Sequence, residues 1–301
     1  MRHSWLRPAV CLASALAAHA AYAQSPTFRS HSSELVVLPV TVTDREGRLV
    51  PDLEPTHFTV YDNGRAQAIA AFSRDDAPVS IALVIDNSGS MRPKLGEVMA
   101  AALAFARESH PEDDLRIVEF NDRVRDPLEG ATVGASDMRG LEAALRTLRP
   151  EGQTALYDAL LYGLEQLDDT SHARRVLVLM SDGADNASRA TLDLVLDRAR
   201  RSDVTIYTIG LFDADARDRN PGVLAALAKA TGGERFLPKS PGPLLAACQR
   251  IAREIRSSYT IGFTPPERDG RYHGVRVELT GEARRGRRVR TRPGYVSGLQ
   301  D

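Results

Sequence analysis

Oxygen-bearing side chains follow an apolar run in the stretch ALVIDNSGSM, residues 82–91 of this 301-residue sequence. The run ends at Asp86, and two hydroxyl side chains follow at alternate positions, Ser88 and Ser90. Gly89 between them allows the chain to turn sharply. Carboxylate and hydroxyl oxygens suit hard divalent cations such as Mg²⁺ and Mn²⁺, whereas Cys and His would be the wrong donors. The stretch is therefore a candidate for binding such a cation.

Two later segments repeat parts of this pattern. Gly152-Gln153-Thr154 opens an expected helix and puts the Thr154 hydroxyl at its start, and the run LVLMSD ends at Asp182 before Gly183. Taken singly, each residue has an ordinary structural explanation, because Ser90 and Thr154 can cap helices and Asp182-Gly183 is a common turn pair. The functional interpretation depends on these residues acting together.

The elements that would bring these segments together are apolar strands separated by helix-length amphipathic stretches. Continuously apolar runs predict a mostly parallel sheet covered on both faces, that is, a doubly wound α/β domain. In such a sheet, ligands bind beyond the carboxyl ends of the strands, where the segments above would meet. The apolar runs are VSIALVID, LRIVEF, RVLVLMSD and VTIYTIGL, and the amphipathic stretches lie near 94–109, 136–148, 155–167, 191–202, 222–230 and 243–255.

The segments on either side of residues 78–257 have a different texture, with short alternating runs and turn signals. Asn63-Gly64 is typical of a two-residue type I′ hairpin. Each flank, 24–77 or 258–301, holds only about 40 β-forming residues, near the size at which a chain struggles to bury a core alone. We therefore predict that the two flanks pair into one small β-sandwich-like module from which the α/β domain projects.

The first 23 residues predict a secretory signal peptide. Basic residues precede an apolar stretch, and Ala21-Tyr22-Ala23 fits a cleavage site before Gln24. The apolar stretch is too short to span a bilayer, so we expect a periplasmic or secreted product. Cleavage leaves Cys248 as the single cysteine, so no internal disulfide is expected, and its apolar neighbours at helical spacing predict a buried side chain.

The charge balance argues against a partner that is attracted by the net charge of the whole protein. The chain has 39 basic and 40 acidic residues, which produce no global field that would attract nucleic acid. Eight arginines lie between Arg271 and Arg292, with RRGRRVRTR from Arg284 to Arg292, and arginines of this kind can bind an anionic envelope surface. The alternation along the run favours a solvated hairpin whose arginines keep an edge strand soluble.

Considered together, the oxygen-bearing segments resemble the von Willebrand factor type A family. The metal-ion-dependent adhesion site of that family is written Asp-x-Ser-x-Ser, then a distant Thr, then a distant Asp. All five positions are present, in that order: Asp86, Ser88, Ser90, Thr154 and Asp182. The resemblance covers residues 79 to about 255. The segments DNSGSM, SDGADN, SYTIGFTP and RPGY look like an exported bacterial subgroup of the family.

The resemblance implies a metal-dependent protein-binding module with a role in adhesion or scaffolding. Ser88, Ser90 and Thr154 would bind Mg²⁺ or Mn²⁺ directly, with Ca²⁺ as a third option, while Asp86 and Asp182 would act largely through water. Neutral hydroxyls leave the ion electrophilic, so an Asp or Glu of a partner protein can complete its coordination shell. The resemblance leaves the oligomeric state open.

Two enzymatic alternatives compete with this interpretation. Asp86 could be the nucleophile of a Mg²⁺-dependent phosphatase. Such enzymes generally need a second acid two residues later, where this chain has Ser88. A serine hydrolase would need a histidine to deprotonate its nucleophile. The histidines at 57, 110, 172 and 273 stand in no recognisable motif and are expected on the surface, so we expect no catalytic function.

Overall fold

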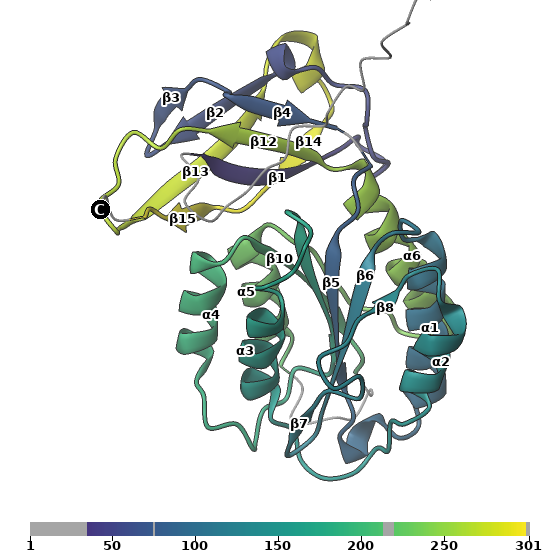
Figure 1. The fold of residues 1–301 in the computed structure, drawn as a ribbon. Coiled ribbons are helices and arrows are strands. Elements are labelled where there is room, and N and C mark those ends of the chain that lie inside the picture. Colours follow the sequence, from purple (N-terminus) through teal and green to yellow (C-terminus); the bar gives the residue numbers. More distant parts are fainter. Residues whose placement is uncertain (1–34, 75, 213–219, 299–301) are drawn as a thin grey trace, which may run out of the picture.

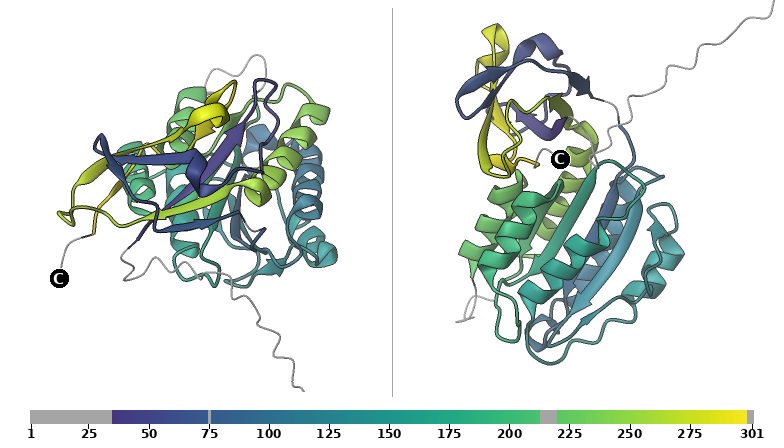
Figure 2. Two further views of the ribbon diagram at one scale, coloured as in Figure 1. Left: turned by 90° about the horizontal axis from the view of Figure 1, so that it is seen from above. Right: turned by 60° about the vertical axis from the view of Figure 1, so that its left-hand side comes forward.

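The computed structural model describes residues 35–74, 76–212 and 220–298, which form an α/β domain and a β module at one end of it (Figures 1 and 2). The predicted signal peptide lies outside the described residues. Within the described part of the chain, no helix has the length and apolar character needed to cross a membrane.

The sheet of the α/β domain has the order β11-β10-β9-β5-β6-β7, and β8 also pairs with β6. The first five strands are parallel, whereas β7 and β8 run antiparallel to β6 and were not predicted. The doubly wound, mostly parallel fold is thus confirmed. The strands are β5 (Ser80–Asp86), β6 (Asp114–Phe120), β7 (Val124–Arg125), β8 (Val133–Gly134), β9 (Arg175–Ser181), β10 (Val204–Gly210) and β11 (Arg235–Phe236).

Among the described residues, six α-helices cover the sheet, one for each predicted amphipathic stretch. Ile81, Leu83 and Ile85 of β5 pack with α1, α2 and α6, while Ala82 and Val84 face α3, α4 and α5. Figure 1 shows the two helix layers on opposite sides of the sheet. Burial on both faces is why the strands read as continuous apolar runs. The helices are α1 (Leu95–Glu108), α2 (Met138–Leu145), α3 (Leu156–Gln166), α4 (Leu192–Arg201), α5 (Pro221–Thr231) and α6 (Pro241–Ser257), with Cys248 buried in α6 as predicted.

The β module, residues 35–74 with 258–298, consists of two four-stranded antiparallel sheets of order β14-β1-β12-β4 and β15-β13-β2-β3. Each sheet combines strands from both flanks, and one apolar core that includes Leu38, Val60 and Ile261 is buried between them. Asn63 and Gly64 have the positive φ angles that the hairpin between β2 and β3 requires. The strands are β1 (Val36–Thr43), β2 (Phe58–Asp62), β3 (Arg65–Gln67), β4 (Ala71–Ser73), β12 (Tyr259–Phe263), β13 (Tyr272–Leu279), β14 (Arg288–Arg290) and β15 (Gly294–Val296).

Two arginines join the β module to the α/β domain, which corrects the prediction of solvated edge arginines. Arg290 forms ion pairs with the fully buried Glu254 and with Glu234. Arg292 is only 4 % exposed and donates to the carbonyl oxygens of Ser202 and Arg200 at 2.9 and 2.6 Å. The alternation of polar and apolar residues along a strand does not show whether its polar side faces solvent or contacts a second domain, because polar residues occur on either kind of surface.

His273 is also buried, so its predicted place on the surface was wrong. Its Nδ1 lies 2.9 Å from Asp62 Oδ1 and its Nε2 lies 3.1 Å from Asp269 Oδ1. Tyr295 donates to the other oxygen of Asp62. Burial by itself lowers the pKa of His273, but the hydrogen bonds and charges of Asp62 and Asp269 outweigh it and raise the pKa above its usual value of 6.5. Two carboxylate acceptors favour a ring that carries both protons.

The raised pKa of His273 predicts that the protein loses stability as the pH rises. A group whose pKa is higher in the folded than in the unfolded protein contributes its full stabilisation of the folded state at pH values below the unfolded pKa. This contribution is lost as the pH rises through the folded pKa. Between about pH 6 and about pH 9, the free energy of unfolding by urea should fall by about 1 kcal/mol more in the wild type than in His273→Gln. His110→Gln serves as the control. Equal pH dependence in the wild type and His273→Gln would contradict the assignment.

Candidate metal centre

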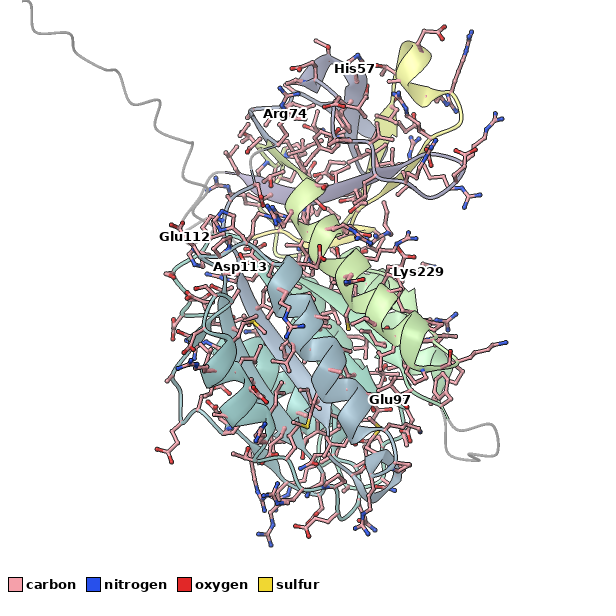
Figure 3. All side chains as sticks on the ribbon, turned by 90° about the vertical axis from the view of Figure 1, so that its right-hand side faces the viewer. His57, Arg74, Glu97, Glu112, Asp113 and Lys229 are labelled. Carbon is pink, nitrogen blue, oxygen red and sulfur yellow. The ribbon has the colours of Figure 1, made fainter. Side chains whose placement is uncertain are left out.

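The five predicted site residues lie in three loops at the end of the sheet opposite the β module (Figure 1). β5 starts beside the module and delivers Asp86 at its far end, where a 3-10 helix, η2 (Gly89–Met91), turns the chain into α1. Figure 3 labels Glu97, in the first turn of α1, and Asp113, which lies toward the β module. The site is therefore presented at the tip of the molecule, as expected for parallel strands.

Hydrogen bonds connect four of the five predicted residues. The Ser88 and Ser90 hydroxyl oxygens are 3.1 Å apart, and Ser90 donates to Asp182 Oδ2 at 3.2 Å. Asp86 Oδ1 accepts the backbone N–H of Ser88 at 3.0 Å. Asp86, Ser88 and Asp182 are buried, whereas Ser90 is exposed. These oxygens form one cluster that reaches solvent through Ser90.

Thr154 stands in a loop held against this cluster by backbone contacts. The N–H of Gly89 donates to the carbonyl of Gly152 at 3.2 Å, which joins the Thr154 loop to the loop of the two serines. The carbonyl of Thr154 accepts N–H groups of Asn186 and Ala187, in the loop that follows Asp182. Thr154 itself is 4 % exposed. The three loops are thus tied to one another around the predicted site.

Two residues that the sequence interpretation missed, Ser181 and Asn186, support the cluster through hydrogen bonds. The Ser181 hydroxyl donates to Asp86 Oδ2 at 2.7 Å and accepts the N–H of Gly183 at 3.0 Å. Asn186 Oδ1 accepts the N–H of Thr154 at 2.8 Å. Both residues belong to the quoted SDGADN loop, but only long-range contacts show what their side chains do. They fix the directions of Asp86 and the Thr154 loop.

The electrostatics of Asp86 match a position that favours a cation. The pKa of Asp86 is raised to about 6, mainly by burial and to a smaller extent by the charge of Asp182, against the lowering effect of its hydrogen bonds with Ser88 and Ser181. A nearby cation would favour the ionised form and lower the pKa again. Two buried carboxylates without a cation repel each other, so a divalent ion would relieve this repulsion.

The donor set fits a hard divalent ion. Three hydroxyls and two carboxylates offer only oxygen, and the structure brings two of the hydroxyls and both carboxylates into one hydrogen-bonded cluster. Across the described ranges, no group of three or more His, Cys, Asp or Glu side chains is arranged to hold a metal ion. Any ion bound at these loops would therefore depend on the serine and threonine oxygens, a donor set that suits Mg²⁺ or Mn²⁺.

Comparison with known proteins identifies the α/β domain. The family model "von Willebrand factor type A domain" matches residues 80–240, more than half of the chain. An uncharacterised protein from Synechocystis sp. is 29 % identical over 212 residues, which cover 65 % of this chain and 46 % of that protein. The chain therefore spans about half the length of this relative.

Solved structures extend the likeness to the fold. A von Willebrand factor type A protein from Catenulispora acidiphila superposes with a TM-score of 0.53 at 16 % identity, covering 90 % of this chain and 76 % of that one. This coverage exceeds the α/β domain and includes much of the β module. The PilB minor pilin from Streptococcus sanguinis gives a TM-score of 0.50 at 12 % identity over 64 % of each chain. The chain belongs to the von Willebrand factor type A domain family.

Proposed function

We propose that this protein is an exported, non-enzymatic binding protein that engages an acidic side chain of a partner protein through Mg²⁺ or Mn²⁺. Domains of this family typically mediate protein interactions. The observation that carries the metal dependence is the contact of Ser88, Ser90 and Asp182 across two loops at the exposed end of the sheet. The partner's class is a protein that presents Asp or Glu on its surface, in adhesion or in scaffolding.

Each site residue has a separate role in this proposal. Ser88, Ser90 and Thr154 would hold the ion, and Asp86 and Asp182 would orient its bound water and balance its charge. When bound, the ion supplies an electrophilic position that a carboxylate can occupy. Because Ser90 is exposed, that position would face outward. Contacts around the ion would then set the specificity, since a single metal–carboxylate bond contributes little selectivity.

The phosphatase alternative is less well supported by the same geometry. A phosphoryl-accepting carboxylate needs access to substrate, whereas Asp86 is fully buried and both of its oxygens accept hydrogen bonds. The position two residues later is Ser88, whose hydroxyl is engaged with Ser90 and has no acidic proton to give a leaving group. We therefore retain the binding function.

Two features of the chain bear on location and on the anionic-surface alternative. The predicted signal peptide is the basis for proposing a periplasmic or secreted protein. The C-terminal arginines do not act as one free patch, because Arg290 and Arg292 are used at the contact between module and domain. Metal-bridged protein binding therefore explains more of the observed geometry than binding to an envelope surface.

Affinity capture from envelope and medium fractions tests the proposed function. The mature protein should retain a partner in Mg²⁺ or Mn²⁺ and lose it in EDTA, and Asp86→Ala should lose it in all three conditions. Asp122→Asn, which changes a carboxylate outside the predicted set at the same end of the sheet, should behave like the wild type. Identical partners in Mg²⁺, in EDTA and with Asp86→Ala would reject the metal bridge.

A further inference from the structure

A small cavity lies far from the metal centre, at the contact between the β module and the α/β domain. Its walls come from β1, from the starts of β9 and β10, and from the end of α6, and include Val37, Pro39, Arg174, Val176 and Ile255. Water centres can occupy about 40 Å³ of it. A single water needs about 10–15 Å³ by this measure. The cavity therefore has room for roughly three waters, or for one ligand of similar size.

Unpaired polar atoms gather around this cavity. Among the described residues, six buried side-chain nitrogen or oxygen atoms have no hydrogen-bond partner. Two belong to residues that line the cavity, Arg174 Nη1 and Arg175 Nε. A third is the Ser80 hydroxyl, beside Arg175 in the sheet, and a fourth is Glu254 Oε2. Buried polar groups are nearly always hydrogen-bonded, so this concentration indicates a missing partner.

Arg174 is the group that most needs this partner. Its Nη2 donates to the carbonyl of Ile255 at 2.5 Å, and no carboxylate of the described chain lies within ion-pair distance of it. Burial lowers the pKa of Arg174, while the more distant charges of Asp113 and Asp76 raise it. An arginine keeps its charge in proteins. The Nη1 atom is thus buried without a partner, although the side chain as a whole is partly exposed, and the guanidinium has no contacting counter-ion among the described residues.

The carboxylates near the cavity already have partners, whereas Arg175 in its wall has an unpaired Nε, like the unpaired Nη1 of Arg174. Asp203 lines the wall, but its carboxylate lies 3.9 Å from Arg292. Glu254, close by, pairs with Arg290 and accepts from Tyr207. The remaining surface is mostly apolar, through Val37, Pro39 and Val176 among others. A ligand here would meet the side chains of Arg174 and Arg175, each with an unpaired nitrogen, and an apolar wall.

We propose that this cavity binds a small carboxylate anion with a short apolar end, about the size of acetate. The carboxylate would accept from Arg174 Nη1 and supply the missing negative charge, and the apolar end would contact the wall formed by Val37 and Pro39. Water alone can satisfy the hydrogen bond, but it leaves the cation without a counter-charge. An inorganic oxyanion offers the charge but has no apolar end for this wall. The site is independent of the proposed metal centre.

Saturation-transfer difference NMR of the acetate methyl group tests the proposal on the mature full-length protein, with chloride at matched ionic strength. The wild type should show a saturable acetate signal, and Arg174→Gln should weaken the affinity about tenfold or more. Arg174→Gln removes a charge that has no contacting counter-ion, so it should fold. Ala173→Leu, an exposed change at the cavity rim, should also abolish the signal by filling the space. Arg253→Gln, an exposed arginine on α6, should bind like the wild type.

Three results would overturn the proposal. An acetate signal that survives in both Arg174→Gln and Ala173→Leu would place binding elsewhere. Thermal stabilisation by inorganic phosphate but not by acetate, dependent on Arg174, would assign the site to an inorganic oxyanion. If neither anion gives a binding signal or thermal stabilisation of the wild type, the cavity holds only water.

Discussion

Glu254→Gln is expected to lower the free energy of unfolding by about 3 kcal/mol, because it removes the charge that Arg290 faces in a buried contact. Glu254 is fully buried, and its Oε1 accepts from Tyr207 at 2.6 Å and from Thr41 at 3.3 Å as well as from Arg290. Loss of one member leaves the others with an incomplete network. Thermal unfolding should shift down by roughly 6–12 °C at 2–4 °C per kcal/mol.

An exposed ion pair supplies the control for this prediction. Glu142 and Arg146 pair on the surface of α2, and Glu142→Gln should cost no more than about 0.5 kcal/mol. Equal stability losses in Glu254→Gln and Glu142→Gln would show that the contact between module and domain does not depend on the buried charge. In the double variant Glu254→Gln with Arg290→Gln, part of the loss should be recovered, because no unpaired guanidinium remains.

Asp86→Asn should weaken the binding of Mn²⁺ by about 10- to 100-fold, the usual cost of removing a group that orients the ligands of a metal. The variant keeps the size of the side chain but loses its negative charge and changes its hydrogen bonds with Ser88 and Ser181. Burial already disfavours the ionised form of this carboxyl group. The metal-free variant should therefore be about as stable as the metal-free wild type. Manganese paramagnetic resonance measures the affinity directly.

Asp122→Asn is the matched control for the metal experiment. Asp122 lies near Gly152 at the same end of the sheet, yet it is not one of the five predicted residues. Its replacement should leave Mn²⁺ affinity within about twofold of the wild type, as expected for a surface charge. An unchanged affinity in Asp86→Asn, or no Mn²⁺ binding by the folded wild type, would refute the proposed centre.

The α/β fold could be predicted because its periodicities are local. Strands buried on both faces must be apolar throughout, and helices that cover a sheet must be apolar on one side, so both patterns appear in the sequence. The edge strands β7 and β8 were missed because they have only two residues each. The flanks were predicted to pair because neither could bury a core alone.

The parts that escaped prediction depend on contacts between distant residues. His273 shares the buried face of β13 with Val275, Val277 and Leu279. Only its three-dimensional neighbours Asp62 and Asp269 show how a polar ring is accommodated there. Arg290 is likewise held at the contact between module and domain by the buried Glu254, 36 residues earlier. At the metal centre, the five oxygen-bearing residues were chosen by their order along the chain, whereas Ser181 supports Asp86 through a contact across 95 residues.

The α/β domain is connected to the β module twice, where the chain enters β5 and where α6 continues into β12. Both connections lie at the end opposite the five candidate oxygens. If a tethered partner pulls on that tip, the tension divides between two covalent strands and is carried into sheets in which the two flanks are interleaved. Such an arrangement resists mechanical detachment better than a domain hung from a single linker would.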